Sequence, residues 1–283
     1  MVKRKDPARV ALAVVAYAVM YYAISSYFFV PLLYWVGGLL VAGTAGLLLS
    51  AGFANWLSLR IFENRSLPAV GLPLNRGAAD NLGFGLLGGI GSACLVLAPP
   101  LLVGAAHLTR GPEHPSAGAL PFVTLLLIAG AVGEEMLFRG YGFQVLLAAF
   151  GPYATILPVS ILFALLHGGN PNATWFGLAN TAGFGMLFGY AFLRSRDLWL
   201  PIGLHFGWNV TLPLFGVNLS GLTMRVTGHE MAWTAVKLWS GGDYGPEASI
   251  LTSAVLLLLF VYVWKAPLRR QHSPLTDSPA ENA

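Results

Sequence analysis

Long apolar segments recur along the whole chain, and they limit its fold more than any other feature. Residues 10–30 and 121–132 (PFVTLLLIAGAV) are two of them. In lipid every backbone N–H and C=O must be paired within the protein, and a helix does this in about 20 residues. Only 10% of the 283 residues are charged, against about a quarter in a soluble domain. The sequence therefore predicts an all-α, polytopic transmembrane bundle.

We predict eight spans, with the fifth as the shortest. They lie near residues 10–29, 33–53, 80–104, 119–138, 153–167, 173–193, 199–216 and 249–264. The first is too long for the apolar core of a signal peptide and no small-x-small cleavage site follows it, so we expect it to be retained. Residues 54–79 are expected to form an interfacial helix and a turn. The Pro/Ser-rich tail from Pro267 is expected to be disordered.

Lysine and arginine are distributed unevenly between the two predicted sides of the membrane. An even number of spans puts both termini on one side, and only Arg110, Arg225 and Lys237 fall on the other, with Arg139 inside a span. The positive-inside rule then places both termini in the cytoplasm of a multi-pass cell-membrane protein. The basic residues flank the spans and form no basic domain, so nucleic acid is not an expected partner. The single cysteine, Cys94, is expected to be a small buried apolar residue.

Ionisable residues inside a membrane are costly and therefore mark functional sites. The candidates in or at the ends of the spans, together with one amide, are Glu134, Glu135, Arg139, His167, His205 and Asn209. The other histidines, His107, His114, His229 and His272, stand in polar connections and are expected to be loop residues.

The segment GEEMLFRG holds two adjacent acids, Glu134 and Glu135, which point about 100° apart on a helix. Glu135 and Arg139 have the i,i+4 spacing of an ion pair, with the acid first. One carboxylate would then be neutralised, and the other left free for proton chemistry. The alternative is a purely structural ion cluster.

The remaining candidates can each be interpreted as structural residues as well as functional ones. His205 and Asn209 share one helix face, which suits either convergence on one target or a packing hydrogen bond. His167 precedes a helix-ending Gly-Gly-Asn-Pro, where a histidine also suits the helix dipole. Taken together, the set supplies a general base, an assisting imidazole and oxyanion donors.

Three motifs in order resemble the CAAX-protease and bacteriocin-processing family of intramembrane proteases, also called Abi or Rce1-like. They are Glu-Glu-x-x-x-Arg at 134–139, Phe-x-x-x-His ending at His167, and His-x-x-x-Asn at 205–209. The resemblance spans residues 130–212. It divides the chain into N-terminal helices with an interfacial segment (1–110), a catalytic core (111–216), and an outer loop, last span and tail (217–283).

The resemblance implies roles for these residues. Glu134 would activate water with help from His167, His205 and Asn209 would form an oxyanion hole, and Glu135 and Arg139 would shape the site. The family has also been described as metal-dependent, so a zinc ion on Glu134, His167 and His205 is an alternative, although an Asn amide is a poor zinc ligand. No other cofactor is expected.

The expected function is an intramembrane endopeptidase acting on membrane-associated or lipidated, CAAX-like proteins or peptides. A non-catalytic scaffold or immunity protein is one alternative. A proton-coupled transporter, with Glu134 and His167 as the relay, is another. A transporter would favour inverted repeats or paired broken helices, whereas one break is predicted here, at 168–171.

The predicted topology makes one demand on the fifth span. His205 lies about 9 Å from the cytoplasmic face, whereas His167 lies at the other end of the fifth span. The two can meet at Glu134 only if that span starts late, tilts strongly or is broken.

Two glycine patterns lie inside predicted spans. Residues 83–88 (GFGLLG) match G-x-G-x-x-G, but they follow no predicted strand, so no nucleotide loop is expected. Gly85 with Gly89, and Gly185 with Gly189, have the spacing of close helix contacts.

Overall fold

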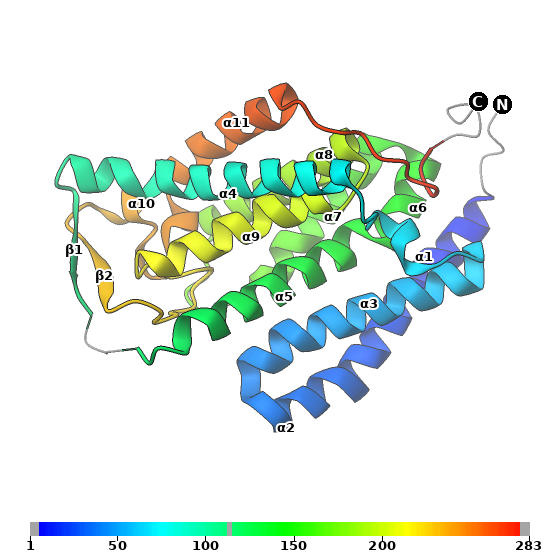
Figure 1. Ribbon diagram of the computed structural model, residues 1–283, viewed down its shortest axis with the longest axis horizontal. Coiled ribbons are helices and arrows are strands. Elements are labelled where there is room, and N and C mark those ends of the chain that lie inside the picture. The colour runs from blue at the N-terminus through cyan, green and yellow to red at the C-terminus, as the bar shows by residue number, and fades with distance from the viewer. Residues whose placement is uncertain (1–5, 112–114, 278–283) are drawn as a thin grey trace.

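The computed structural model describes residues 6–111 and 115–277, which leaves Lys3, Arg4, Lys5 and His114 outside the described part. The protein is a bundle of long helices with one small sheet at one end (Figure 1). The helices are α1 (Pro7–Ile24), α2 (Val30–Val41), α3 (Leu47–Ser58), α4 (Arg76–Leu102), α5 (Ala119–Arg139), α6 (Tyr141–Phe150), α7 (Pro152–His167), α8 (Trp175–Ser195), α9 (Trp199–Leu214), α10 (Lys237–Ser240) and α11 (Ile250–Lys265).

Four helical stretches of the described chain are long and apolar enough to cross a membrane, which agrees with the predicted helical membrane protein. They are Pro7–Glu63, Arg76–Leu102, Ala119–Phe150 and Trp175–Ser195. Two shorter apolar helices, Pro152–His167 and Ile250–Lys265, accompany them. Each of the eight predicted spans falls on a helix or helical arm, although the number of membrane crossings stays a prediction.

The first two predicted spans form one helical hairpin whose reversal differs from the expected position. We expected a turn near residues 30–32, but the helix continues through Pro31, which follows the π-helical turn Ser25–Phe29. The chain reverses at Gly38, whose φ of 72° is accessible to glycine without strain. The expected helix after residue 54 forms as a continuation of α3 that runs to Glu63 and ends at the left-handed Asn64, and its interfacial position stays a prediction.

Helices α4 and α9 pack closely at the glycines of the predicted contact motif. A Cβ at Gly89 would lie 2.3 Å from the Leu204 carbonyl oxygen, and one at Gly85 would lie 2.4 Å from that of Leu200. On α8, a Cβ at Gly185 would lie 2.9 Å from Ser160 Cα of α7. The packing reading of these glycines is therefore confirmed.

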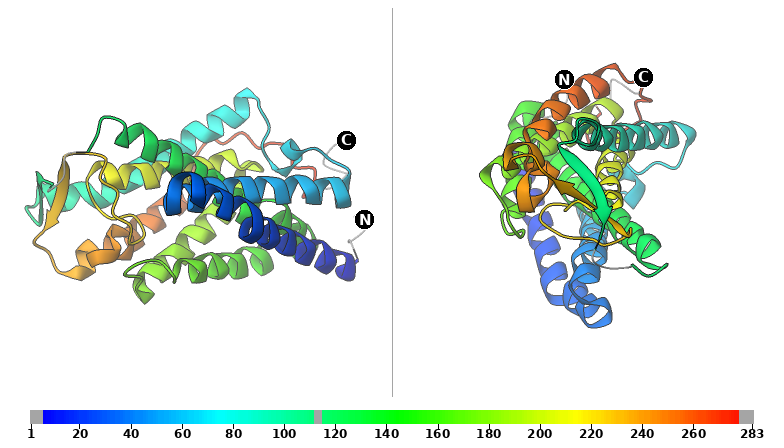
Figure 2. Two further views of the ribbon diagram at one scale, coloured as in Figure 1. Left: turned by 90° about the horizontal axis from the view of Figure 1, so that it is seen from below. Right: turned by 90° about the vertical axis from the view of Figure 1, so that its left-hand side faces the viewer.

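The short helix α6 was not predicted as a separate element, and it explains how α7 reaches the site. Helix α5 breaks at Gly140, where a Cβ would lie 2.0 Å from the Met136 carbonyl oxygen. Asn55 Oδ1 then accepts the Tyr141 N–H at 2.7 Å, at the start of α6. After a turn at Gly151, α7 runs back along α6, as Figure 2 also shows. The fifth predicted span forms as α7, with His167 at its end beside Glu134, and whether it starts late, tilts or is broken in the membrane stays a prediction.

The small sheet lies at the end of the molecule opposite the start of α1. Strands β1 (Ala106–Arg110) and β2 (His229–Trp233) pair antiparallel, with Ala106 opposite Trp233. The start of α1 and the segment after α11 lie together at the opposite end (Figure 1). This arrangement agrees with an even number of crossings.

Residues 267–277 fold against the bundle, which corrects the expected disorder over this part of the tail, and residues 278–283 lie outside the described part. Asn81 accepts the backbone N–H of Arg269 at 2.9 Å and donates to its carbonyl at 2.8 Å. The Gln271 N–H donates to the Ser195 carbonyl at 2.7 Å, and Leu275 is buried in the apolar cluster beside α1 and α6. Backbone pairing with a buried amide and one apolar anchor hold this part of the segment in place.

Candidate active site

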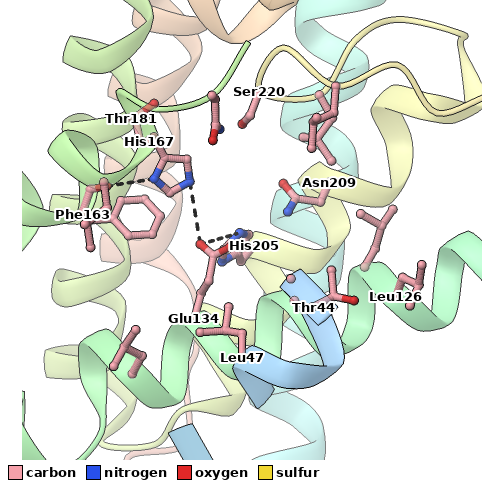
Figure 3. A pocket seen from close by; sticks show the side chains of 18 of the residues that line it. Thr44, Leu47, Leu126, Glu134, Phe163, His167, Thr181, His205, Asn209 and Ser220 are labelled. Atoms are coloured by element: carbon pink, nitrogen blue, oxygen red, sulfur yellow. Dashed lines mark hydrogen bonds and ion pairs between the residues drawn. The ribbon is translucent and has the colours of Figure 1, made fainter. Parts of the chain in front are cut away.

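The structure brings the predicted polar residues from α5, α7 and α9 together around one carboxylate. Oε2 of Glu134 lies 3.9 Å from Nε2 of His167 and 3.9 Å from Nε2 of His205 (Figure 3). Asn209, one turn beyond His205 on α9, lines the same cavity. The four side chains thus face one space although they come from three helices.

This space is a cavity of about 510 Å³ that also touches the N-terminal hairpin and the loop after α9. The side chains of Glu134 and His167 are 23% and 19% exposed, whereas those of Glu135 and Arg139 are completely buried. The adjacent glutamates therefore divide as predicted, one facing the cavity and one facing the protein interior.

Glu135 is the centre of a buried ion cluster. Its Oε1 accepts from Arg139 Nη1 at 3.2 Å and lies 2.9 Å from Nδ1 of His205. Arg139 Nη2 donates to the Gly185 carbonyl at 2.9 Å. The guanidinium also stands over the rings of Phe163 and Phe188, at 5.0 and 5.3 Å from their centroids. The predicted i,i+4 pair forms, and it holds His205 in position.

The partners of the two imidazoles fix which nitrogen faces the cavity. Nδ1 of His167 lies 2.8 Å from the Phe163 carbonyl oxygen, which can only accept, so this nitrogen carries hydrogen. The other nitrogen, Nε2, is then the basic one in the neutral ring, and it faces Glu134. The Phe-x-x-x-His spacing matters because residue i supplies both this carbonyl and a ring 4.5 Å from the imidazole. His205 is likewise fixed, by Glu135 and by stacking on Phe188 at 5.0 Å.

Glu134 Oε2 is buried and has no hydrogen-bond partner among the described residues. A spacing of 3.9 Å is too long for a hydrogen bond, but one water molecule can bridge such a gap. The carboxylate and the two imidazoles are thus arranged to bind and polarise a small polar molecule.

The same residues do not fit a zinc ion as they are placed. Two ligands of a tetrahedral zinc lie about 3.3 Å apart, from metal–ligand distances near 2.0–2.1 Å, which is shorter than the two separations of 3.9 Å. Within the described ranges, no group of three His, Cys, Asp or Glu is placed to hold a metal. The zinc alternative on Glu134, His167 and His205 therefore has no support in this geometry.

Sequence reasoning missed an acidic residue of this cavity, Glu247, in the turn Pro246–Ala248 before α11. Ser220, from the loop after α9, lines the cavity with it. Both residues lie in the segment 217–248, which composition marks only as an outer loop. The available signal is the glycine-rich GGDYG before Glu247, where Gly241, Gly242 and Gly245 adopt positive φ and fold the loop tightly.

The fold and this site define a helical membrane protein with an acid–imidazole cavity inside the bundle. A comparison with family models matches residues 115–211 to the Rce1-like family, described as type II CAAX prenyl endopeptidase Rce1-like. The predicted resemblance is confirmed: the matched segment contains all six predicted site residues and is similar to the Rce1-like family. A search of curated proteins finds no match.

Proposed function

We propose that the protein is a multi-pass cell-membrane endopeptidase that hydrolyses peptide bonds of membrane-associated or lipidated proteins with a water activated by Glu134. The observation that carries the proposal is the position of Glu134 Oε2 between two imidazoles, while Arg139 neutralises the neighbouring Glu135. The family match supports a CAAX-type protease at the level of the family.

In the proposed mechanism, Glu134 removes a proton from water, and the hydroxide attacks the carbonyl carbon of the scissile bond. His167 shares this proton through Nε2, because its Nδ1 is held by the Phe163 carbonyl. His205 and the Asn209 amide donate to the developing oxyanion, a role that for His205 requires hydrogen on Nε2. The proton held by Glu134 then passes to the leaving amine as the C–N bond breaks.

The cavity wall suggests the kind of substrate. The N-terminal hairpin and the first part of α5 contribute an apolar part of the wall, with Leu39, Leu40, Leu47 and Leu126, whereas Glu134, His167, His205 and Asn209 form a polar part. This division suits a peptide whose scissile bond lies at the polar part while an apolar side chain or lipid lies against the leucines.

The test compares membrane proteomes of cells that carry the wild-type protein or Glu134→Gln, a change that keeps shape and removes the base. An uncut precursor should accumulate with Glu134→Gln. Glu230→Gln, an acid on β2 paired with Arg225, serves as the matched control and should leave processing intact. An unchanged set of protein termini would refute the peptidase and favour a scaffold, and proton-coupled flux without any cleavage product would indicate a transporter.

A further inference from the structure

A second carboxylate lines the cavity and takes no part in the chemistry above. Glu247 is 7% exposed and lines the same cavity as Glu134 and His167. Its turn is fixed to the bundle, because Asn180 Nδ2 donates to the Glu247 carbonyl at 2.8 Å. A buried acid in this place needs a reason beyond solubility.

The carboxylate is held through one of its two oxygens. Oε2 of Glu247 accepts from the backbone N–H of Ser220, and from the Ser220 hydroxyl at 2.9 Å. Ser220 presents both donors to one atom because its φ of 48° turns the loop back at this point. Among the described residues no hydrogen bond to Oε1 is made at ordinary distance, and the nearby Trp208 indole N–H only lowers the pKa of this carboxyl, so Oε1 can accept from a molecule in the cavity.

The charges around the cavity determine which kind of hydrogen-bond donor Glu247 Oε1 favours. Among the described lining residues the ionisable ones are the carboxylates Glu134 and Glu247, two histidines and Tyr21, with no lysine or arginine. Arg139, the nearby cation, is used by Glu135. Burial raises the pKa of Glu247, against the hydrogen bonds from Ser220 and the charge of His167, which lower it. An incoming cation would offset the cost of this buried charge, whereas an anion would add to it.

We propose that Glu247 is a specificity residue that binds a lysine or arginine side chain of the substrate on the loop side of the scissile bond. This inference rests on the proposed function, because it requires a peptide in the cavity. It also predicts discrimination against an acidic side chain at the same substrate position. A charge-assisted hydrogen bond of this kind corresponds to a preference of about tenfold or more for lysine over an uncharged side chain of equal length.

The test measures binding in the catalytically silenced Glu134→Gln protein, so that it does not depend on turnover. The probes are fluorescent nine-residue peptides with a central S-farnesyl cysteine, in which each other position in turn is lysine, norleucine or glutamate. At one position lysine should bind at least about tenfold more tightly than norleucine, and glutamate more weakly than both. Glu134→Gln/Glu247→Gln should lose this lysine preference and keep the affinity for norleucine.

The control separates the charge from the loop. Ser220→Gly removes the hydroxyl donor, suits the positive φ and leaves the carboxylate in place, so the lysine preference should persist. A lysine preference at no position, or one that survives Glu247→Gln, would overturn the proposal. The lysine preference itself is measured in protein that keeps Glu247, so the proposal stays testable even if Glu247→Gln fails to fold. If the wild type binds these peptides with the predicted preference but cleaves none of them, the proposed peptidase fails while the cation subsite stands.

Discussion

Replacing Arg139 by methionine removes a cation and keeps most of the apolar stem. In the structure the guanidinium pairs with Glu135 at 3.2 Å, donates to the Gly185 carbonyl at 2.9 Å and stands between two phenylalanine rings. Methionine can replace none of the polar contacts. Glu135 would remain completely buried, with the His205 imidazole as its one other polar contact among the described side chains.

The size of the effect follows from leaving a buried charge unpaired. Removing one partner of a buried pair costs about 3–5 kcal/mol. For a chain of this size, that lowers the melting temperature by about 10 °C. Glu135→Gln/Arg139→Met removes both charges, so the double variant should be more stable than the sum of the two single losses by about 1–3 kcal/mol.

The assay is thermal unfolding of the purified protein in mild detergent, followed by far-UV circular dichroism. Glu134→Gln is the matched control and should melt close to the wild type, because Glu134 Oε2 has no hydrogen-bond partner among the described residues. The reasoning is refuted if Arg139→Met melts within about 2 °C of the wild type, or if the double variant shows no recovery.

Three further predictions concern packing, pH and catalysis. Gly89→Val should destabilise the protein by several kcal/mol, because its Cβ would lie 2.3 Å from a backbone oxygen, whereas Gly91→Val, two residues away in open space, should change the melting temperature little. Burial raises the pKa of Asp197 to about 6 from 3.8. The folded state therefore binds this proton more tightly than the unfolded state does. The stability that proton binding contributes is complete below about pH 4 and is lost as the pH rises through about 6. Melting temperatures measured from pH 4 to 7 should show this fall, worth up to about 3 kcal/mol, and Asp197→Asn should remove it; an equal fall in that variant would assign it to another group. Asn209→Ala should lower kcat by about 10²-fold through loss of an oxyanion donor, measured by peptide cleavage with the melting temperature as the control, and a change in KM alone would contradict that role.

The sequence predicted the helical class and the charged centre of the site because both depend on local chemistry. A carboxylate or an imidazole inside an apolar run is costly wherever the helix lies, so Glu134, Glu135, Arg139 and His205 could be selected before any contact was known. The Glu135–Arg139 pair also follows from helix spacing alone.

Other features depend on contacts between segments that are far apart in the sequence, and hydrophobic periodicity does not reveal such contacts. The reversal at Gly38 could not be chosen over the nearby Pro31 from composition. The tail to residue 277 is ordered because its backbone meets Asn81, a residue almost 200 positions earlier. Glu247 enters the cavity through a loop whose path depends on Ser220 and Asn180, so its acid looked like an ordinary loop residue.

The paired run of α6 and α7 restricts how this part of the chain can change in length. One residue added to α6 would draw His167 back by about 1.5 Å, and one added to α7 would restore its height but rotate its ring by about 100° about the helix axis. Insertions that preserve the site must therefore come as matched additions of about one whole turn in both helices. We expect natural or engineered variants of this chain to lengthen or shorten α6 and α7, the two helices after Gly140, by whole helical turns.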